Sequence, residues 1–206
     1  MKKYFFIFAA IVFFTVGLLA QEQRAPASNF SKTEREDFNS KKFNWEDAST
    51  IKGGTIVKGG YLLLKGKRPT FSPNPVNVVS TSILPFDPKN NFKITVNLNI
   101  IELTGYSVFQ IILNSGNVVF GIAEGDWAAV VNGATTQMIQ GLKKTSKKDN
   151  VSLSIQKEGK KLYFFYNDSL LGSLESQEIK SSDVTLSIGS IVKSAEVRVY
   201  EVIVEY

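Results

Sequence analysis

The chain has 206 residues, contains neither histidine nor cysteine, and carries 24 basic and 19 acidic residues. These absences exclude Ser-His-Asp and Cys-His catalysis, the common zinc and iron sites, and disulfide bonds. The formal net charge of +5 is too mild to predict a nucleic-acid partner.

Residues 1–20 have the pattern of a secretory signal peptide. Lys2 and Lys3 precede an uncharged, largely apolar run from Tyr4 to Leu19, and Ala20 is a small residue directly before polar sequence. An uncleaved membrane anchor is the alternative, but the apolar run is slightly short for a spanning helix. We therefore expect cleavage near Ala20, a secreted or periplasmic location, and no transmembrane span in the mature chain.

The next segment marks the expected start of the folded domain. Residues 21–36 are polar, contain Pro26 and show no periodicity, which predicts a flexible leader. A single domain is expected over residues 37–206, with Phe43 and Trp45 as its first buried aromatics. Two short strands within residues 51–65, a proline-containing loop at 68–77 and a strand at 77–83 should follow.

From Phe92 onward the sequence indicates one strand after another. Residues 92–100 alternate apolar and polar side chains, the pattern of a strand with one buried face. Turn signals such as Ser115-Gly116, Gly125-Asp126 and Asn132-Gly133 separate the later segments. The predicted strands are 92–101, 106–113, 117–124, 127–132, 135–140, 150–157, 161–166, 169–174, 184–189 and 195–205. A change of phase near Tyr200-Glu201 predicts a β-bulge.

Evenly spaced short strands of this kind favour an all-β fold, namely a two-sheet antiparallel jelly-roll sandwich. Two stretches strengthen this interpretation. Asp37-Phe38-Asn39 followed by Phe43-Asn44-Trp45 resembles the opening of concanavalin A-like, laminin-G-like sandwiches in secreted bacterial proteins. The hairpin from Asn150 to Asn167 is similar to one typical of that superfamily. The resemblance implies a jelly roll of two sheets, in which many members bind glycans or proteins and some are glycoside hydrolases.

Candidate catalytic and metal-binding carboxylates are few. One hydrolase branch of the superfamily carries an E-x-D-x-x-E strand, and Glu124-Gly125-Asp126 matches its first two acids, but Ala129 stands at the third position. We therefore predict no catalytic residues and no cofactor. The resemblance also raises the possibility of a calcium site, for which Asp126 and Asp168 are weak candidates.

The turns allow an estimate of which side chains share a sheet face. If Ser115-Gly116, Gly125-Asp126 and Asn132-Gly133 each form two-residue loops, one face carries a core that includes Phe109, Phe120 and Trp127. The opposite face then carries small residues at its centre, surrounded by polar and aromatic ones. Trp127 lies beside a turn, where it either caps the core edge or stacks on a sugar ring. The predicted ligand-binding residues are Tyr106, Gln110, Gly121, Ala128, Thr135, Gln137 and Trp127.

Three functions fit this sequence. The favoured hypothesis is a secreted, non-catalytic binding module for a carbohydrate or cell-envelope polymer. The alternative is a protein–protein interaction module of an extracellular or periplasmic assembly. A divergent glycoside hydrolase is the third, and it depends on Glu124. The face opposite the core is interpreted as a shallow groove with a floor of small residues that could hold an extended glycan chain. The alternative is an ordinary outer sheet face, because scattered apolar residues are common on protein surfaces.

Overall fold

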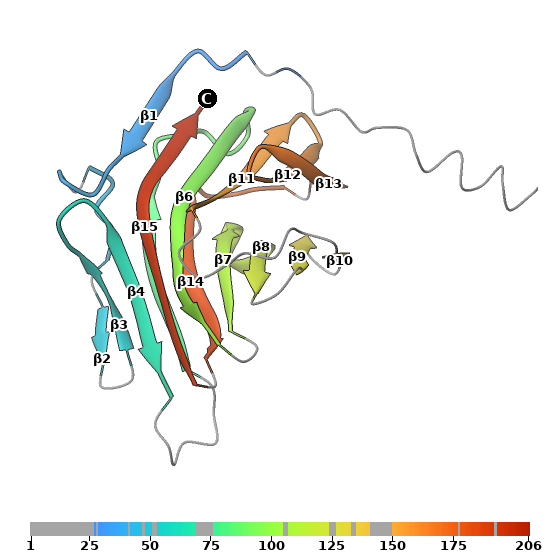
Figure 1. The fold of residues 1–206 in the computed structure, drawn as a ribbon. Coiled ribbons are helices and arrows are strands. Elements are labelled where there is room, and N and C mark those ends of the chain that lie inside the picture. Colours follow the sequence, from blue (N-terminus) through green and yellow to red (C-terminus); the bar gives the residue numbers. More distant parts are fainter. Residues whose placement is uncertain are drawn as a thin grey trace, which may run out of the picture.

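The structure is a computed structural model, and its described part forms two layers of β-strands (Figure 1). It describes residues 27, 29–40, 42–46, 48–50, 53–68, 76–104, 107–123, 127–132, 135–140, 150–176, 178–191 and 193–206. Within these ranges, the side chains of residues 48–50, 115, 127–132, 135–140 and 190 are not described. The expected signal peptide lies outside the described residues, and no helix within them is long and apolar enough to cross a membrane.

One layer is an antiparallel sheet of nine strands, counted over the described residues. Its main path in spatial order is β13 (Ser169–Glu175), β12 (Lys161–Tyr166), β11 (Asn150–Glu158), β6 (Phe92–Leu103), β15 (Ser194–Glu205), β4 (Leu62–Lys67), β3 (Gly53–Val57) and β2 (Ala48–Thr50). The ninth strand, β1 (Thr33–Glu36), pairs with β15 beyond the part of β15 that pairs with β4. Figure 1 shows β6 and β15 as long neighbouring strands.

The other layer is a sheet of six strands within the described ranges. In spatial order these are β10 (Thr135–Gln140), β9 (Trp127–Asn132), β8 (Val118–Ala123), β7 (Val108–Leu113), β14 (Asp183–Ile191) and β5 (Val76–Ile83). A short 3-10 helix, η1 (Asn114–Gly116), connects β7 to β8. The two antiparallel sheets form a jelly-roll sandwich, so the predicted all-β fold class is confirmed.

The core lies between the two sheets and is built from the inward positions of their strands. In β6 the inward side chains are almost completely buried, as its alternating sequence predicts; they are Phe92, Ile94, Val96 and Leu98. Phe120 of β8 meets Phe164 of β12 across the sandwich, with ring centroids 5.5 Å apart. Removal of these apolar surfaces from water is the main force that holds the sheets together.

Strand β1 corrects the predicted start of the folded domain. The sequence predicts a flexible leader over residues 21–36, yet Thr33–Glu36 pair in register with Glu205 to Val202 of β15. The strand has the sequence TERE, which contains no apolar residue and therefore gives no periodic signal. It forms because β15 offers a free edge there, and the ordered structure therefore begins before Asp37.

Two predictions about strand register are confirmed. Leu113 pairs with Val118, the register that a two-residue Ser115-Gly116 loop predicts. In β15 the pairing with β6 shifts between Val199 and Glu201, which is the β-bulge expected near Tyr200-Glu201. Turn length and phase changes therefore carry reliable register information for these strands.

Candidate functional site

Four neighbouring strands of the six-stranded sheet present a mixed polar surface on their outer side. Pairing places Val79 of β5, Ser187 of β14, Gln110 of β7 and Gly121 of β8 in one row. The next row contains Thr81, Thr185, Ile112 and Val119. The alternate positions of these strands, such as Phe109, Phe120 and Leu186, lie in the core. We call the two rows, together with the adjoining Gly189 of β14, the Gln110 face.

Two glycines make room for the Gln110 side chain. A Cβ atom on Gly121 would lie 2.9 Å from Val108 Cγ1 and 3.1 Å from Gln110 Cγ. A Cβ atom on Gly189 would lie 3.2 Å from Gln110 Oε1. Both glycines therefore fix where the Gln110 side chain lies, because any larger residue would displace it.

The amide of Gln110 is available to a ligand. The side chain is partly exposed, and within the described part of the chain no hydrogen bond holds it. Beside it, the Thr81 and Thr185 hydroxyls are 2.8 Å apart and hydrogen-bonded to each other, and Ser187 is 3% exposed. An amide offers two donors and one acceptor in a fixed plane, and the partly exposed Thr81 and Thr185 hydroxyls add further donors and acceptors, whereas Ser187 is buried. This arrangement suits a ligand that carries many hydroxyl groups.

A recess of about 640 Å³ continues the Gln110 face beyond β5. Thr81, Ile83 and Asp183 belong to the outer side of the sheet and also line this recess. Its far side is formed by the segment from Lys42 to Glu46 and by Glu34 of β1. The Gln110 face and the recess share Thr81, so an extended ligand could contact both.

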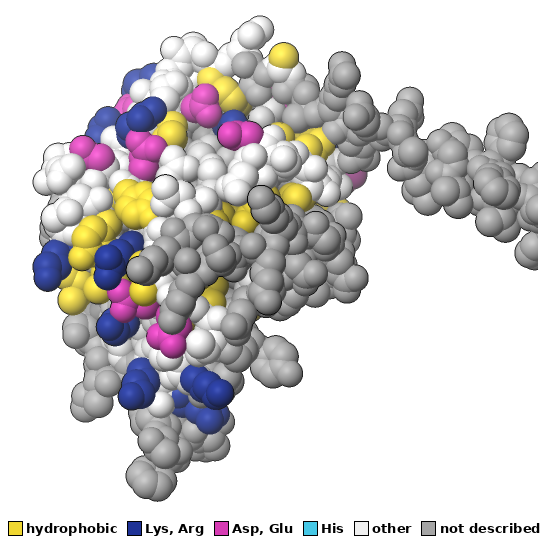
Figure 2. Space-filling model, viewed as in Figure 1, with side chains coloured by type: hydrophobic (Ala, Val, Ile, Leu, Met, Phe, Trp, Pro, Cys, Tyr) yellow, Lys and Arg dark blue, Asp and Glu magenta, His cyan; other side chains and the backbone are white. Residues whose placement is uncertain are grey.

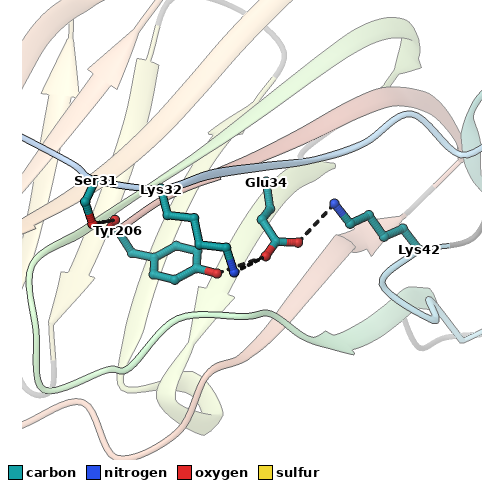
Figure 3. Close-up of polar contacts among 5 residues, drawn as sticks. All are labelled: Ser31, Lys32, Glu34, Lys42 and Tyr206. Carbon is teal, nitrogen blue, oxygen red and sulfur yellow. Dashed lines mark hydrogen bonds and ion pairs between the residues drawn. The ribbon is translucent and has the colours of Figure 1, made fainter.

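A charged network borders the recess. Glu34 accepts hydrogen bonds from the Lys32 and Lys42 ammonium groups at 2.6 and 3.0 Å and from the Tyr206 hydroxyl at 3.0 Å (Figure 3). These contacts, that of Lys32 first, lower the pKa of Glu34 to about 2. In Figure 2 the basic and acidic side chains near β1 lie next to one another. The network therefore contains two ammonium groups and one carboxylate, which leaves one net positive charge at this end of the recess.

The Glu34 network should make stability depend on pH in the acid range. Its folded-state pKa, about 2, lies below the ordinary value of 4.5, so the carboxylate stabilises the folded state above pH 4.5. That contribution is lost as the pH falls from 4.5 towards 2. We expect the difference in melting temperature between wild type and Glu34→Gln to shrink over this range. A difference that stays constant between pH 5 and pH 2 would contradict the assignment.

The predicted ligand-binding residues are only partly brought together. Gln110 and Gly121 lie side by side as expected. The predicted register of β9 is wrong by one residue. Gly121 pairs with Ala129, and Ile122 pairs with Ala128. A two-residue Gly125-Asp126 loop would not give this register. A shift of one residue moves every position of a strand to the other face.

The same shift carries over to β10. Gln137 pairs with Val130, which is opposite the core residue Phe120, and Thr135 pairs with Asn132. Ala128, Thr135 and Gln137 therefore take register positions on the core side of the sheet. Trp127 takes a position on the outer side, two residues along β9 from Ala129. The side chains of these four residues are not described.

Four other predicted positions have different outcomes. Tyr106, Glu124 and Asp126 lie outside the described residues. Asp168 is exposed in the turn between β12 and β13, on the opposite sheet from Gln110. Among the described residues, no group of three or more acidic side chains could hold a metal ion.

Sequence reasoning missed the contribution of β5 and β14 to the Gln110 face. Thr81, Thr185 and Ser187 come from strands about 100 residues apart in the sequence, and their pairing is not encoded in any turn. In β5 the hydroxyl residues Ser80, Thr81 and Ser82 are consecutive and give no alternation. In β14 the one available signal is that Thr185 and Ser187 alternate with apolar residues. That pattern identifies a polar face but not its neighbours.

The fold is shared with glycan-active enzymes of known structure. A β-glucanase from Bacillus licheniformis matches with a TM-score of 0.62 at 10% sequence identity, over 86% of this chain and 100% of that one. A prokaryotic β-1,3-1,4-glucanase (lichenase) derived from a mouse hindgut metagenome matches with a TM-score of 0.61 at 11% identity, over 83% and 97%. A sialidase matches with a TM-score of 0.62 at 11% identity over 85% of this chain, which spans 18% of that protein.

No protein-family model matches the chain, and no curated protein sequence matches it significantly. The structural matches establish the fold alone, because their sequence identities are low. The chain has a concanavalin A-like jelly-roll fold, as its sequence resemblance implied. Its fold is one that enzymes acting on carbohydrates use.

Proposed function

We propose that the protein is a secreted, non-catalytic module that binds a carbohydrate or cell-envelope polymer through the Gln110 face. The observation that carries this proposal is the amide of Gln110, which is partly exposed and has no hydrogen bond to any residue that the structure describes. It lies between Ser187 and Gly121 in its row, beside the hydroxyl pair of the next row. Amide and hydroxyl groups recognise sugar hydroxyls by hydrogen bonds in both directions. The continuous recess beyond β5 supports an extended ligand, and the shared fold of glycan-active enzymes supports a carbohydrate.

The chemistry of the same face favours binding over catalysis. Glycosidases of the common type need two carboxyl groups, about 5–5.5 Å apart for retention or about 6.5–9.5 Å for inversion. Among the described outer positions of β5, β14, β7 and β8, Asp183 is the one carboxylate, and it lies at the end of the sheet opposite Ile83. An uncharged glutamine at the centre cannot serve as acid, base or nucleophile. The glycosidase hypothesis depends on Glu124, which lies outside the described residues, and it predicts that Glu124→Gln abolishes turnover.

The binding site can be tested with two variants of different kind. Gln110→Ala removes the amide, and Gly189→Ala leaves it in place but displaces its Oε1 atom. We expect each to weaken binding of mixed-linkage β-glucan or another polysaccharide that binds the wild type, by about tenfold for Gln110→Ala. Affinity electrophoresis against a panel of neutral and acidic polysaccharides measures this. Unchanged binding in both variants would refute the site.

Secretion is part of the proposal and rests on the sequence of residues 1–20. Their basic start, uncharged apolar run and Ala20 are the features that signal peptidase substrates share. Mature protein recovered from a periplasm or culture medium should begin at Gln21 when its N-terminus is sequenced. Protein that retains Met1 in the membrane fraction would instead support an uncleaved anchor.

A protein partner is the second candidate, and exposed apolar residues on β5 favour it. The side chain of Ile83 is 73% exposed and that of Val79 is 46% exposed, both on the outer side of an edge strand. Exposed apolar residues at an edge can mark an interaction site. Capture of the same envelope protein by wild type but not by Ile83→Lys would favour this function. Polysaccharide binding that is weakened in Gln110→Ala would favour the first.

A further inference from the structure

A second hollow lies on the outer side of the nine-stranded sheet, on the opposite side of the sandwich from the Gln110 face. Its volume is about 490 Å³. Its polar lining comes from β6, β11, β15 and the turn after β12, and Asp168 stands at its edge. We call it the amide hollow, because asparagines dominate its lining of Asn97, Asn150, Ser152, Asn167, Tyr200 and Glu201.

The β-bulge in β15 helps to build this hollow. The register shift between Val199 and Glu201 leaves Tyr200 as the extra residue of the strand. Its hydroxyl donates to Asn150 Oδ1 at 3.3 Å, and burial raises the pKa of Tyr200, which keeps the hydroxyl protonated as a donor. Bulges often redirect a side chain near a binding site. Here the bulge brings an aromatic residue beside the amides.

The hydrogen bonds fix which atoms the amides offer to a ligand. Asn150 Oδ1 accepts from Asn99 Nδ2 and from the Tyr200 hydroxyl, each at 3.3 Å. Asn167 Oδ1 accepts from the Ser152 backbone N–H at 2.8 Å. Each of these amide oxygens already accepts at least one hydrogen bond, and no described residue accepts from the amide nitrogens of Asn150 and Asn167. A ligand that brings acceptor oxygens would therefore match these two donors.

The charges of the hollow select against an acidic ligand. Glu201 Oε1 is paired with Arg35 NH1 at 2.8 Å, and Glu201 Oε2 accepts from Asn97 Nδ2 at 2.7 Å. Asp168 is exposed at the edge and would repel an anion. Acceptor-rich but uncharged groups fit this site best, and sugar hydroxyls and ring oxygens are such groups.

The residue types themselves point to a binding role. Asparagine is depleted in β-strands, yet Asn97 and Asn99 occupy outer positions in the middle of the central strand β6. Packing does not require them there, because the apolar side chains of β6 lie on the other face. We propose that the amide hollow is a second carbohydrate-binding site, selective for neutral sugars. Two sites on opposite faces would let one molecule bridge two glycan chains.

A charge-for-amide exchange tests this proposal without changing side-chain shape. Asn150→Asp keeps the oxygen that Asn99 and Tyr200 contact but replaces the free N–H donors by a second oxygen. Asn117→Asp is the matched control, because Asn117 is exposed in the β7–β8 connection and the exchange adds the same charge. Isothermal titration of the mature chain uses three probes: mixed-linkage β-gluco-oligosaccharides, neutral galacto-oligosaccharides and acidic oligogalacturonates. We expect Asn150→Asp to weaken binding of a neutral probe about tenfold or more, with Asn117→Asp unchanged.

The comparison with Gln110→Ala separates this proposal from the first site. A neutral probe whose binding is lost in Asn150→Asp but kept in Gln110→Ala supports the amide hollow and counts against the Gln110 face. Loss in Gln110→Ala alone overturns the amide hollow and leaves the first proposal standing. A stoichiometry of two that falls to one in either variant supports both sites. Failure of the wild type to bind any neutral probe, or preferential binding of oligogalacturonate, overturns the proposal.

Discussion

Replacing Phe120 with alanine should lower the free energy of unfolding by about 3–5 kcal/mol. Phe120 and Phe164 are at most 1% exposed, come from different sheets, and have ring centroids 5.5 Å apart with planes inclined by 59°. Truncation removes buried apolar area and leaves a cavity that neither sheet can close alone. Since small domains are stable by about 5–15 kcal/mol, this one contact accounts for a large share of the total.

Urea unfolding followed by circular dichroism measures this effect. Phe120→Leu is the matched control, because it keeps most of the buried volume and should cost well under half as much. If the urea midpoint of Phe120→Ala corresponds to a loss of unfolding free energy below about 1 kcal/mol, the two sheets do not pack at Phe120 as they do in the structure.

The strand pattern of the fold is largely predictable because its core is built from local alternation. Residues 92–100 alternate without interruption, so β6 is recognisable from its sequence alone. The phase change at Tyr200 likewise predicts the bulge in β15, because a bulge inserts one residue into the alternation. In contrast, β1 has four polar residues and depends entirely on the free edge of β15.

The candidate sites are less predictable because they depend on which strands become neighbours. Gln110 and Gly121 are joined by a short connection, so their proximity follows from one turn. The β8–β9 connection differs by one residue from the expected turn, and this alone reverses the faces assigned to Ala128 and Gln137. Thr185 joins the Gln110 face through pairing with a distant strand, which no local pattern specifies.

The amide hollow illustrates the same limit. Asn97 lies between Glu201 and Ser152 because β6 pairs with both β15 and β11. The three residues are spread over more than 100 positions of the chain. Each one looks like an ordinary polar residue on a solvated strand face. The sequence does reveal that asparagine recurs in strand segments, and this unfavourable choice is the feature that should prompt a search for a site.

Replacing Glu36 with alanine should destabilise the protein by about 2–5 kcal/mol, because two buried backbone donors would lose their acceptors. Glu36 is 0% exposed, and its carboxylate accepts from the Phe38 N–H at 2.8 Å and from the Phe43 N–H at 2.7 Å. These bonds hold the segment after β1 in place. That segment carries the aromatic residues of the Asp37-Phe38-Asn39 and Phe43-Asn44-Trp45 stretches. Phe38 has a φ of 60°, an unfavourable conformation that the carboxylate contact stabilises.

The loss of stability in Glu36→Ala should be accompanied by a local change around the loop, which the fluorescence of Trp45 can detect. Trp45 is 4% exposed and its ring centroid is 6.2 Å from that of Phe38. In a Trp127→Phe background, Glu36→Ala should shift the fluorescence of Trp45 to longer wavelength, since the loop no longer shields the indole. Glu36→Gln retains one acceptor and should recover part of the stability. Glu34→Gln, on the same strand but at a partly exposed position, should leave the emission of Trp45 unchanged at neutral pH.

Because the loop also borders the recess beside the Gln110 face, Glu36→Ala should weaken polysaccharide binding even where the protein remains folded.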